Sequence, residues 1–171
     1  NLIANFKGGY EAQKSKSYNS NVIAYGLPTN LDITVPSAGS IYQNASGSNS
    51  DYAFSSWLAI GNVAYQNKYV LSGSFRRDGS SRFGSNNRYG NFWSVGASWN
   101  AEQEEFIKKF DWISQLKIRA SYGVNGNADI GNYDWRPLYG YGSTYNYLGS
   151  TGSAPVAVGN PDLTWAINKP L

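Results

Sequence analysis

Residues 74–100 read SFRRDGSSRFGSNNRYGNFWSVGASWN, and the last ten of them decide the fold. Bulky or apolar side chains occupy every second position of NFWSVGASWN (residues 91–100): Trp93, Val95, Ala97 and Trp99. The positions between them are mostly small and polar: Phe92, Ser94, Gly96 and Ser98. Because successive side chains of a β-strand point to opposite faces, this period of two predicts a strand with one apolar face.

Two further segments have the same alternation. In YVLSGSFR (residues 69–76) the apolar set is Tyr69, Leu71, Gly73 and Phe75. In LKIRASYG (residues 116–123) it is Leu116, Ile118, Ala120 and Tyr122. The short segment Gln66-Asn67-Lys68 before the first of these predicts a tight hairpin with the strand that ends near residue 65. The chain therefore reads as an all-β, antiparallel protein of about six strands.

The composition excludes several classes of protein. Among 171 residues there is no Cys, Met or His, and only 15% are charged. Without histidine or cysteine there is no Ser-His-Asp triad and no imidazole or thiolate metal site. We therefore expect no enzyme activity, metal or cofactor. A formal net charge of +3 does not indicate a nucleic-acid partner.

Alternation alone leaves two architectures open. A soluble β-sandwich that binds carbohydrate and a segment of a transmembrane β-barrel both have strands with one apolar face. The large aromatic residues Tyr69, Trp93, Trp99 and Tyr122 lie near the predicted strand ends, where rings of a barrel meet the membrane interface. This placement favours the barrel. The side chains expected to face lipid are then Leu71, Phe75, Trp93, Val95, Ala97, Trp99, Leu116 and Ile118.

The predicted connections are of two kinds. The turn after Tyr65 is short, and residues 101–114 have the charge order of a short helix, with Glu102, Glu104 and Glu105 before Lys108 and Lys109. Residues 15–51, 78–89 and 125–160 are long, polar and rich in Gly, Ser, Asn and Tyr. Alternation of short inner turns with long outer loops is typical of the two rims of an outer-membrane barrel.

Several motifs resemble one family. RDGSSRFG (residues 77–84), RYG (88–90), LKIRASYG (116–123), GN (126–127) and GNPDLTW (159–165) stand in this order. Together with their surroundings, they resemble the barrel of SusC/RagA-family TonB-dependent outer-membrane transporters of Bacteroidota. The resemblance covers roughly residues 52–166, and it implies that residues 1–171 are part of a barrel domain whose plug domain, signal peptide and barrel C-terminus lie outside the chain.

The resemblance also implies a function and a set of partners. The parent protein would import an oligosaccharide or a peptide across the outer membrane of a Gram-negative bacterium. Its partners would be the remaining barrel and plug, a SusD-like lipoprotein lid, the TonB-ExbB-ExbD complex, lipid or lipopolysaccharide, and the barrel-assembly machinery. A sheet of about six strands cannot close by itself, so the fold is expected to be incomplete alone.

Two sets of side chains are candidate functional residues. The first is a charge cluster on the lumen face or in a loop, which either braces the wall or lines the import path: Arg76, Arg77, Asp78, Arg82, Arg88, Lys117 and Arg119. The second is a group of loop aromatics that either stack on cargo or pack on one another: Trp135, Tyr139, Tyr141, Tyr145 and Tyr147. The acidic residues Glu102, Glu104 and Glu105 are expected to form a solvated helix face.

Overall fold

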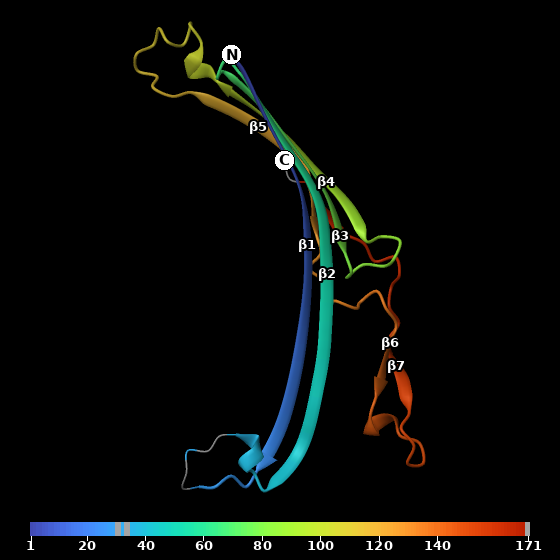
Figure 1. Ribbon diagram of the computed structural model, residues 1–171. Coiled ribbons are helices and arrows are strands. Elements are labelled where there is room, and N and C mark those ends of the chain that lie inside the picture. Colours follow the sequence, from blue (N-terminus) through green and yellow to red (C-terminus); the bar gives the residue numbers. More distant parts are fainter. Residues whose placement is uncertain (30–31, 33–34, 170–171) are drawn as a thin grey trace. The chain divides into compact units, whose positions relative to one another are not determined.

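The computed structural model describes residues 1–29, 32 and 35–169, and it confirms an all-β fold. Six strands form one sheet in the order β1-β2-β3-β4-β5-β8, with antiparallel pairing from β2 to β8. Their bounds are β1 (Leu2–Tyr25), β2 (Ile41–Tyr65), β3 (Tyr69–Ser80), β4 (Tyr89–Asn100), β5 (Lys117–Asn127) and β8 (Ala166–Asn168). Figure 1 shows β3, β4 and β5 side by side. A separate pair, β6 (Leu138–Tyr141) and β7 (Ser153–Ala157), completes the strands.

The chain divides into two compact units. Residues 14–52 form one unit, which contains the second part of β1, the 3-10 helix η1 (Pro36–Ala38) and the first part of β2. Residues 1–13 and 53–171 form the other. The prediction that 15–51 is a long loop is wrong, because only the segment between Tyr25 and Ile41 connects the strands. The Gly, Ser, Asn and Tyr residues of 15–25 and 41–51 belong to β1 and β2, although the described ones form no buried apolar face.

The hairpin between β2 and β3 is confirmed at the predicted position. Gln66 and Asn67 have positive φ angles of 54° and 57°, and the amide of Lys68 donates to the Tyr65 carbonyl at 3.0 Å. Positive φ at both central residues is the geometry of a type I′ turn, whose twist suits a two-stranded ribbon. The turn places Tyr65 opposite Tyr69 and fixes the register of both strands.

The other connections differ from the predicted bounds. The helix expected over 101–114 is a three-residue 3-10 helix, η2 (Ala101–Gln103), followed by turns. Of its acidic residues, Glu104 forms an ion pair with Lys68 from the β2–β3 hairpin, and Glu105 forms one with Lys108 within the segment. The stretch 78–89 shortens to residues 81–88, and the stretch 125–160 contains β6, the 3-10 helix η3 (Ser143–Tyr145) and β7.

Very few apolar side chains are buried. Within the described residues the buried hydrophobic ones are Phe83, Phe92 and Ala101. By contrast, Leu71 is 55% exposed, Phe75 47% and Val95 44%. A β-sandwich would bury these three side chains under a second sheet, and none of the described strands covers them. The helical turns of the described residues are all too short to cross a membrane.

Candidate functional site

The register gives the sheet one continuous apolar face. Trp99, Tyr69 and Tyr65 are cross-strand neighbours, and the rows beyond them bring Leu71 beside Ala97 and Phe75 beside Trp93. On β5, Ile118 lies opposite Trp99 and Tyr122 opposite Val95. We call the part of this face from the Trp57–Arg77–Asn91 row to the Tyr65–Tyr69–Trp99 row the aromatic face. Its members on β2 to β5 are Trp57, Ala59, Gly61, Val63, Tyr65, Tyr69, Leu71, Gly73, Phe75, Arg77, Asn91, Trp93, Val95, Ala97, Trp99, Ile118, Ala120, Tyr122 and Val124.

The residues predicted to face lipid lie together on this face. Leu71, Phe75, Trp93, Val95, Ala97, Trp99 and Ile118 all belong to it, and Leu116 immediately precedes β5. The face continues onto β1, where the Tyr10 ring lies 4.7 Å from Trp57 and the Phe6 ring lies against Gly61. Small residues at Gly61 and Gly73 leave a shallow groove between larger side chains. The result is an exposed apolar surface across five strands.

The opposite side, here the serine face, carries polar side chains that pair across strands. Ser74 and Ser94 share a 2.7 Å hydrogen bond, and the Ser72 hydroxyl donates to the Gly96 carbonyl at 3.2 Å. Small hydroxyls satisfy one another here and leave little side-chain bulk above the backbone. This surface therefore tolerates contact with water or with other polar protein.

Arg76 is the centre of the charge cluster on the serine face. Its Nε donates to Asp78 Oδ1 at 2.5 Å, and its Nη2 lies 3.1 Å from Ser56 Oγ and 3.4 Å from Glu11 Oε2. A pocket of about 160 Å³ adjoins these groups and is closed on one side by Phe54 and Trp165. The guanidinium, whose side chain is 47% exposed, is thus compensated by two carboxylates.

The cluster is smaller than the sequence predicted. Lys117 and Arg119 lie on the serine face, but Arg119 is opposite Ser98 whereas Arg76 is opposite Phe92, six positions along β4. Arg77 lies on the other face, between Trp57 and Asn91, with its guanidinium 5.1 Å from the centre of the Tyr89 ring. Grouping it with Arg76 was wrong, because adjacent residues of a strand point to opposite faces.

The loop between β3 and β4 builds a small core with the segment before β8. Phe83 is fully buried, and its ring centre lies 4.8 Å from that of Trp165, which also meets Phe92 at 5.2 Å. Two glycines allow close contacts in this core. A Cβ on Gly84 would collide with the Pro161 carbonyl, and a Cβ on Gly126 would collide with the Phe92 ring. Two connections that are distant in sequence are thereby held together beside β4 and β5.

Arg82 and Arg88 brace this loop core. Arg82 donates from Nε to Asn132 Oδ1 at 2.9 Å and from Nη1 to the Ala128 carbonyl at 3.0 Å. The Arg88 carbonyl accepts the indole N–H of Trp165 at 3.1 Å, and its guanidinium lies 5.7 Å from the centre of the Trp135 ring. Both arginines therefore connect one loop to another; whether they also line the import path stays a prediction.

The predicted loop aromatics separate into two groups. Trp135 joins the loop core, since its indole N–H donates to the Ser81 carbonyl at 3.1 Å and Arg136 lies 4.7 Å over its ring. Tyr139, Tyr141 and Tyr147 are exposed around the β6–β7 pair. Tyr145 is half-buried against Gly140. The exposed rings stand in residues 137–161, which contain no charged side chain.

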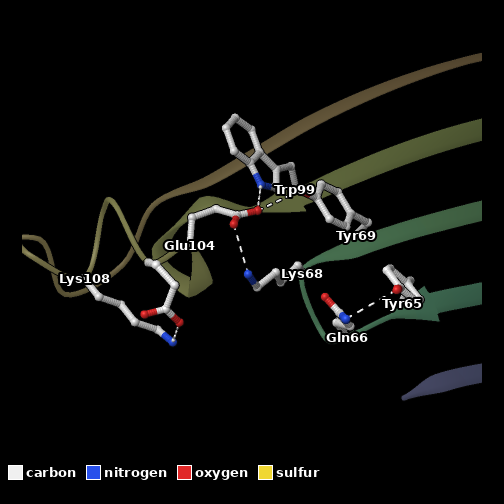
Figure 2. Close-up of polar contacts among 8 residues, drawn as sticks. Tyr65, Gln66, Lys68, Tyr69, Trp99, Glu104 and Lys108 are labelled. Carbon is white, nitrogen blue, oxygen red and sulfur yellow. Dashed lines mark hydrogen bonds and ion pairs between the residues drawn. The ribbon is translucent and has the colours of Figure 1, made fainter.

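Sequence reasoning missed the role of Glu104. Figure 2 shows three side chains converging on its carboxylate: Tyr69 donates to Oε1 at 2.7 Å, Trp99 Nε1 to Oε1 at 3.2 Å, and Lys68 Nζ to Oε2 at 2.9 Å. The hydrogen bonds from Tyr69, Lys68 and Trp99 lower the pKa of Glu104 from 4.5 to about 2. The bond to Glu104 raises the pKa of Lys68. We call Glu104, Lys68, Tyr69 and Trp99 the Glu104 clasp. In the sequence the only sign of it is an acidic residue that follows two strands with aromatic residues at their ends, and two of its three partners lie more than 30 residues away.

No protein-family model matches the chain. TonB-dependent receptor P39 of Formosa agariphila is 44% identical over 114 residues, which is 67% of this chain and 11% of that receptor. TonB-dependent receptor SusC of Bacteroides thetaiotaomicron is 36% identical over 85 residues, 49% of this chain and 8% of SusC. A solved structure of the RagAB peptide importer in its closed-closed state superposes on 98% of this chain and 18% of its own, with a TM-score of 0.87 and 27% identity.

The chain belongs to the SusC/RagA family. It spans 8 to 17% of the lengths of the TonB-dependent receptors that it matches. In this SusC/RagA-family chain the family motifs at 77–84 and 159–165 are the segments that meet in the loop core, through Phe83, Gly84 and Trp165. In this chain the two motifs therefore hold loops together. Within the described residues, no group of three or more acidic side chains could hold a metal ion.

Proposed function

We propose that the chain forms part of the wall of a TonB-dependent importer in the outer membrane of a Gram-negative bacterium of the Bacteroidota. The aromatic face meets lipid, and the serine face lines the interior. One observation carries the proposal: between the Trp57 row and the Tyr65 row the aromatic face of β2 to β5 is exposed and apolar, and Arg77 is the single charge among its named members. Lipid is the solvent that such a face requires.

The dimensions support this assignment. β3 and β4 have 12 residues each, which is close to the roughly 9 to 11 residues of a tilted transmembrane strand. The tight turn at 66–68 and the Glu104 clasp belong to the inner rim, and the loop core belongs to the outer rim, because barrels keep short turns on the inner side. Tyr65, Tyr69 and Trp99 form the aromatic girdle of the inner rim.

The proposed cargo is a peptide or an oligosaccharide. The solved RagAB structures to which the chain is similar are described as peptide importers, which supports a peptide. The exposed rings of Tyr139, Tyr141 and Tyr147, in a segment without charge, suit stacking on the uncharged faces of a sugar. In either case the chain moves cargo without a chemical reaction.

The proposed partners follow from family membership. The remaining barrel and the plug complete the fold at the free edges of β1 and β8, and the plug meets the serine face. A SusD-like lipoprotein closes the outer mouth, the TonB-ExbB-ExbD complex supplies energy, and the barrel-assembly machinery inserts the protein next to lipopolysaccharide. The compensated cluster of Arg76, Asp78 and Glu11 is suited to support a plug, since its charges do not require cargo as a counter-ion.

A charge placed on each face tests the proposal. In the full-length receptor that carries this segment, Val95→Arg is expected to abolish the protein in the outer-membrane fraction and the uptake that depends on it. Ser94→Arg, one residue away on the serine face, is expected to leave a correctly inserted protein. Normal membrane levels of Val95→Arg together with loss of Ser94→Arg would reverse the assignment of the faces.

A further inference from the structure

Arg77 is the single charged residue among the named members of the aromatic face on β2 to β5. Its cross-strand neighbours are Trp57 and Asn91, and its side chain is exposed. Within the described part of the chain it forms no ion pair, whereas Arg76 next to it is bound to two carboxylates. A cation without a counter-ion on an otherwise apolar surface indicates that its partner comes from outside the protein.

The surroundings of Arg77 hold its guanidinium at the rim of this face. The Tyr89 ring lies against Gly79, its cross-strand partner, because Gly79 has no side chain to lift it. The guanidinium of Arg77 lies 5.1 Å from the centre of that ring. Trp57 and Tyr10, whose rings are 4.7 Å apart, flank the same end of the sheet. An arginine among exposed Trp and Tyr rings is the arrangement found at a membrane interface.

The position of Arg77 along the strand fits a headgroup. Eight residues separate it from Tyr69, a rise of about 27 Å along the strand or about 21 Å along the membrane normal at a tilt near 40°. This distance approaches the apolar band of about 25 Å between the two interfaces of a barrel. If Tyr69 marks one interface, Arg77 reaches the other.

The two rims differ in charge. At the Tyr69 end, Lys68 is neutralised by Glu104 at 2.9 Å. At the Arg77 end the named members of the aromatic face include no acid, and the adjacent Asp78 points to the serine face, where it is bound by Arg76. One rim therefore offers an unpaired guanidinium to the membrane and the other does not. The planar, bidentate donor set of arginine matches a phosphate group better than any other lipid group.

We propose that Arg77, with Trp57, Tyr89 and Asn91, forms a binding site for the phosphate of a lipid headgroup at the outer rim. The inference rests on the proposed function, because it requires the aromatic face to be in lipid. Arg77 supplies the charge-assisted hydrogen bonds, the amide of Asn91, which lies opposite Arg77 on β4, is a further donor, and the rings pack against the acyl and sugar portions of the lipid.

The test uses the full-length receptor in detergent, titrated with lipid A and followed by native mass spectrometry. Arg77→Gln is expected to weaken lipid A binding by about tenfold or more, the loss expected for a charge-assisted contact. Arg77→Lys is expected to fall between Arg77→Gln and the wild type. Arg119→Gln, which removes an exposed cation from the serine face, is expected to bind as the wild type does. Dephosphorylated lipid A is expected to bind the wild type as weakly as lipid A binds Arg77→Gln.

Two results would overturn the inference. Equal binding of lipid A by Arg77→Gln and the wild type would exclude Arg77 from the site. Displacement of lipid A by excess inorganic phosphate would mean a site for free anions, not for a headgroup. Oxygen accessibility of a spin label at Val95 separates this inference from the proposed function: a buried label refutes both, and a lipid-exposed label with unchanged binding refutes the headgroup site alone.

Discussion

The phenol of Tyr69 donates a 2.7 Å hydrogen bond to Oε1 of Glu104, a residue 35 positions later in the chain. Tyr69 begins β3 and Glu104 follows β4, so this bond joins the hairpin at 66–68 to the turn at 101–104. With Lys68 and Trp99 it fastens three strand ends at one rim of the sheet. An ionised carboxylate can accept all three bonds because it has several lone pairs and no proton of its own.

The Glu104 clasp predicts a pH dependence. The pKa of Glu104 is about 2 in the folded chain against an ordinary 4.5, so the carboxylate binds its proton less readily when folded. A lowered folded pKa stabilises the fold above the unfolded pKa, and this contribution is lost as the pH falls from 4.5 towards 2. Glu104→Gln should therefore unfold more easily than the wild type at neutral pH, and the difference should vanish near pH 2.

Urea titrations of the full-length receptor in detergent at a series of pH values measure this difference. Glu105→Gln is the matched control, since Glu105 is 85% exposed in its side chain and its ion pair is with Lys108, at 3.3 Å. A difference between Glu104→Gln and the wild type that stays constant down to pH 2 would exclude ionisation of Glu104 as its source.

Gly84→Ala should loosen the loop core. The added Cβ collides with the backbone carbonyl of Pro161, which cannot rotate away as a side chain tip can. We expect a cost of about 1 to 3 kcal/mol, as for overpacking of a close contact. Faster hydrogen exchange in residues 81–88 would report it. Gly73→Ala is the control, because its Cβ would come no closer than 3.8 Å to the Ser94 carbonyl; equal exchange in both variants would contradict the close approach.

Trp165→Phe should separate stacking from hydrogen bonding in the loop core. The phenyl ring keeps the contact with Phe83, while the indole N–H to the Arg88 carbonyl is lost. That carbonyl still accepts the Ser80 amide at 3.0 Å, so we expect a loss of only about 0.5 to 1 kcal/mol. Trp165→Ala removes the ring as well and should lose clearly more in the same urea titration. Equal losses for the two variants would show that stacking contributes nothing.

Residues 1–171 expressed alone should associate. The sheet has free edges at β1 and β8, and its aromatic face exposes Phe75, Val95 and Ile118. Unpaired strand edges and a large apolar surface both favour association. Size-exclusion chromatography in detergent is expected to show heterogeneous aggregates. A single monomeric peak with cooperative unfolding in urea would contradict the assignment of the chain to an open barrel wall.

Much of the sheet could be predicted from local pattern, because a period of two is visible wherever apolar and small residues alternate. The alternation predicted which side chains share a face in 69–76, 92–99 and 116–123, and the short segment between two such runs predicted the hairpin at Gln66–Lys68. The alternation failed for most of 15–51, where Gly, Ser, Asn and Tyr form strands without an apolar face, so nothing distinguishes them from a loop. Arg77 was misplaced because it was grouped by closeness in sequence instead of by alternation.

The contacts that build the loop core and the Glu104 clasp could not be predicted in the same way. Glu104 meets Lys68 and Tyr69 across 36 and 35 residues, and Trp165 reaches Arg88 across 77. Such partners depend on the register of several strands at once. The order of charges around Glu104 is equally typical of a helix. The contacts of Glu104 with Lys68, Tyr69 and Trp99, at the ends of neighbouring strands, appear only in the folded structure.

The central claim is that the aromatic face lies in lipid and the serine face does not. Spin labels at Ser94, Val95, Ile118 and Ser121 of the full-length receptor, reconstituted in a bilayer, test it most directly through their collision with oxygen and with a water-soluble nickel chelate. We predict that labels at Val95 and Ile118 collide with oxygen and are shielded from nickel, whereas labels at Ser94 and Ser121 have low oxygen accessibility. High oxygen accessibility at Ser94 and Ser121 with nickel access at Val95 and Ile118 would contradict the account.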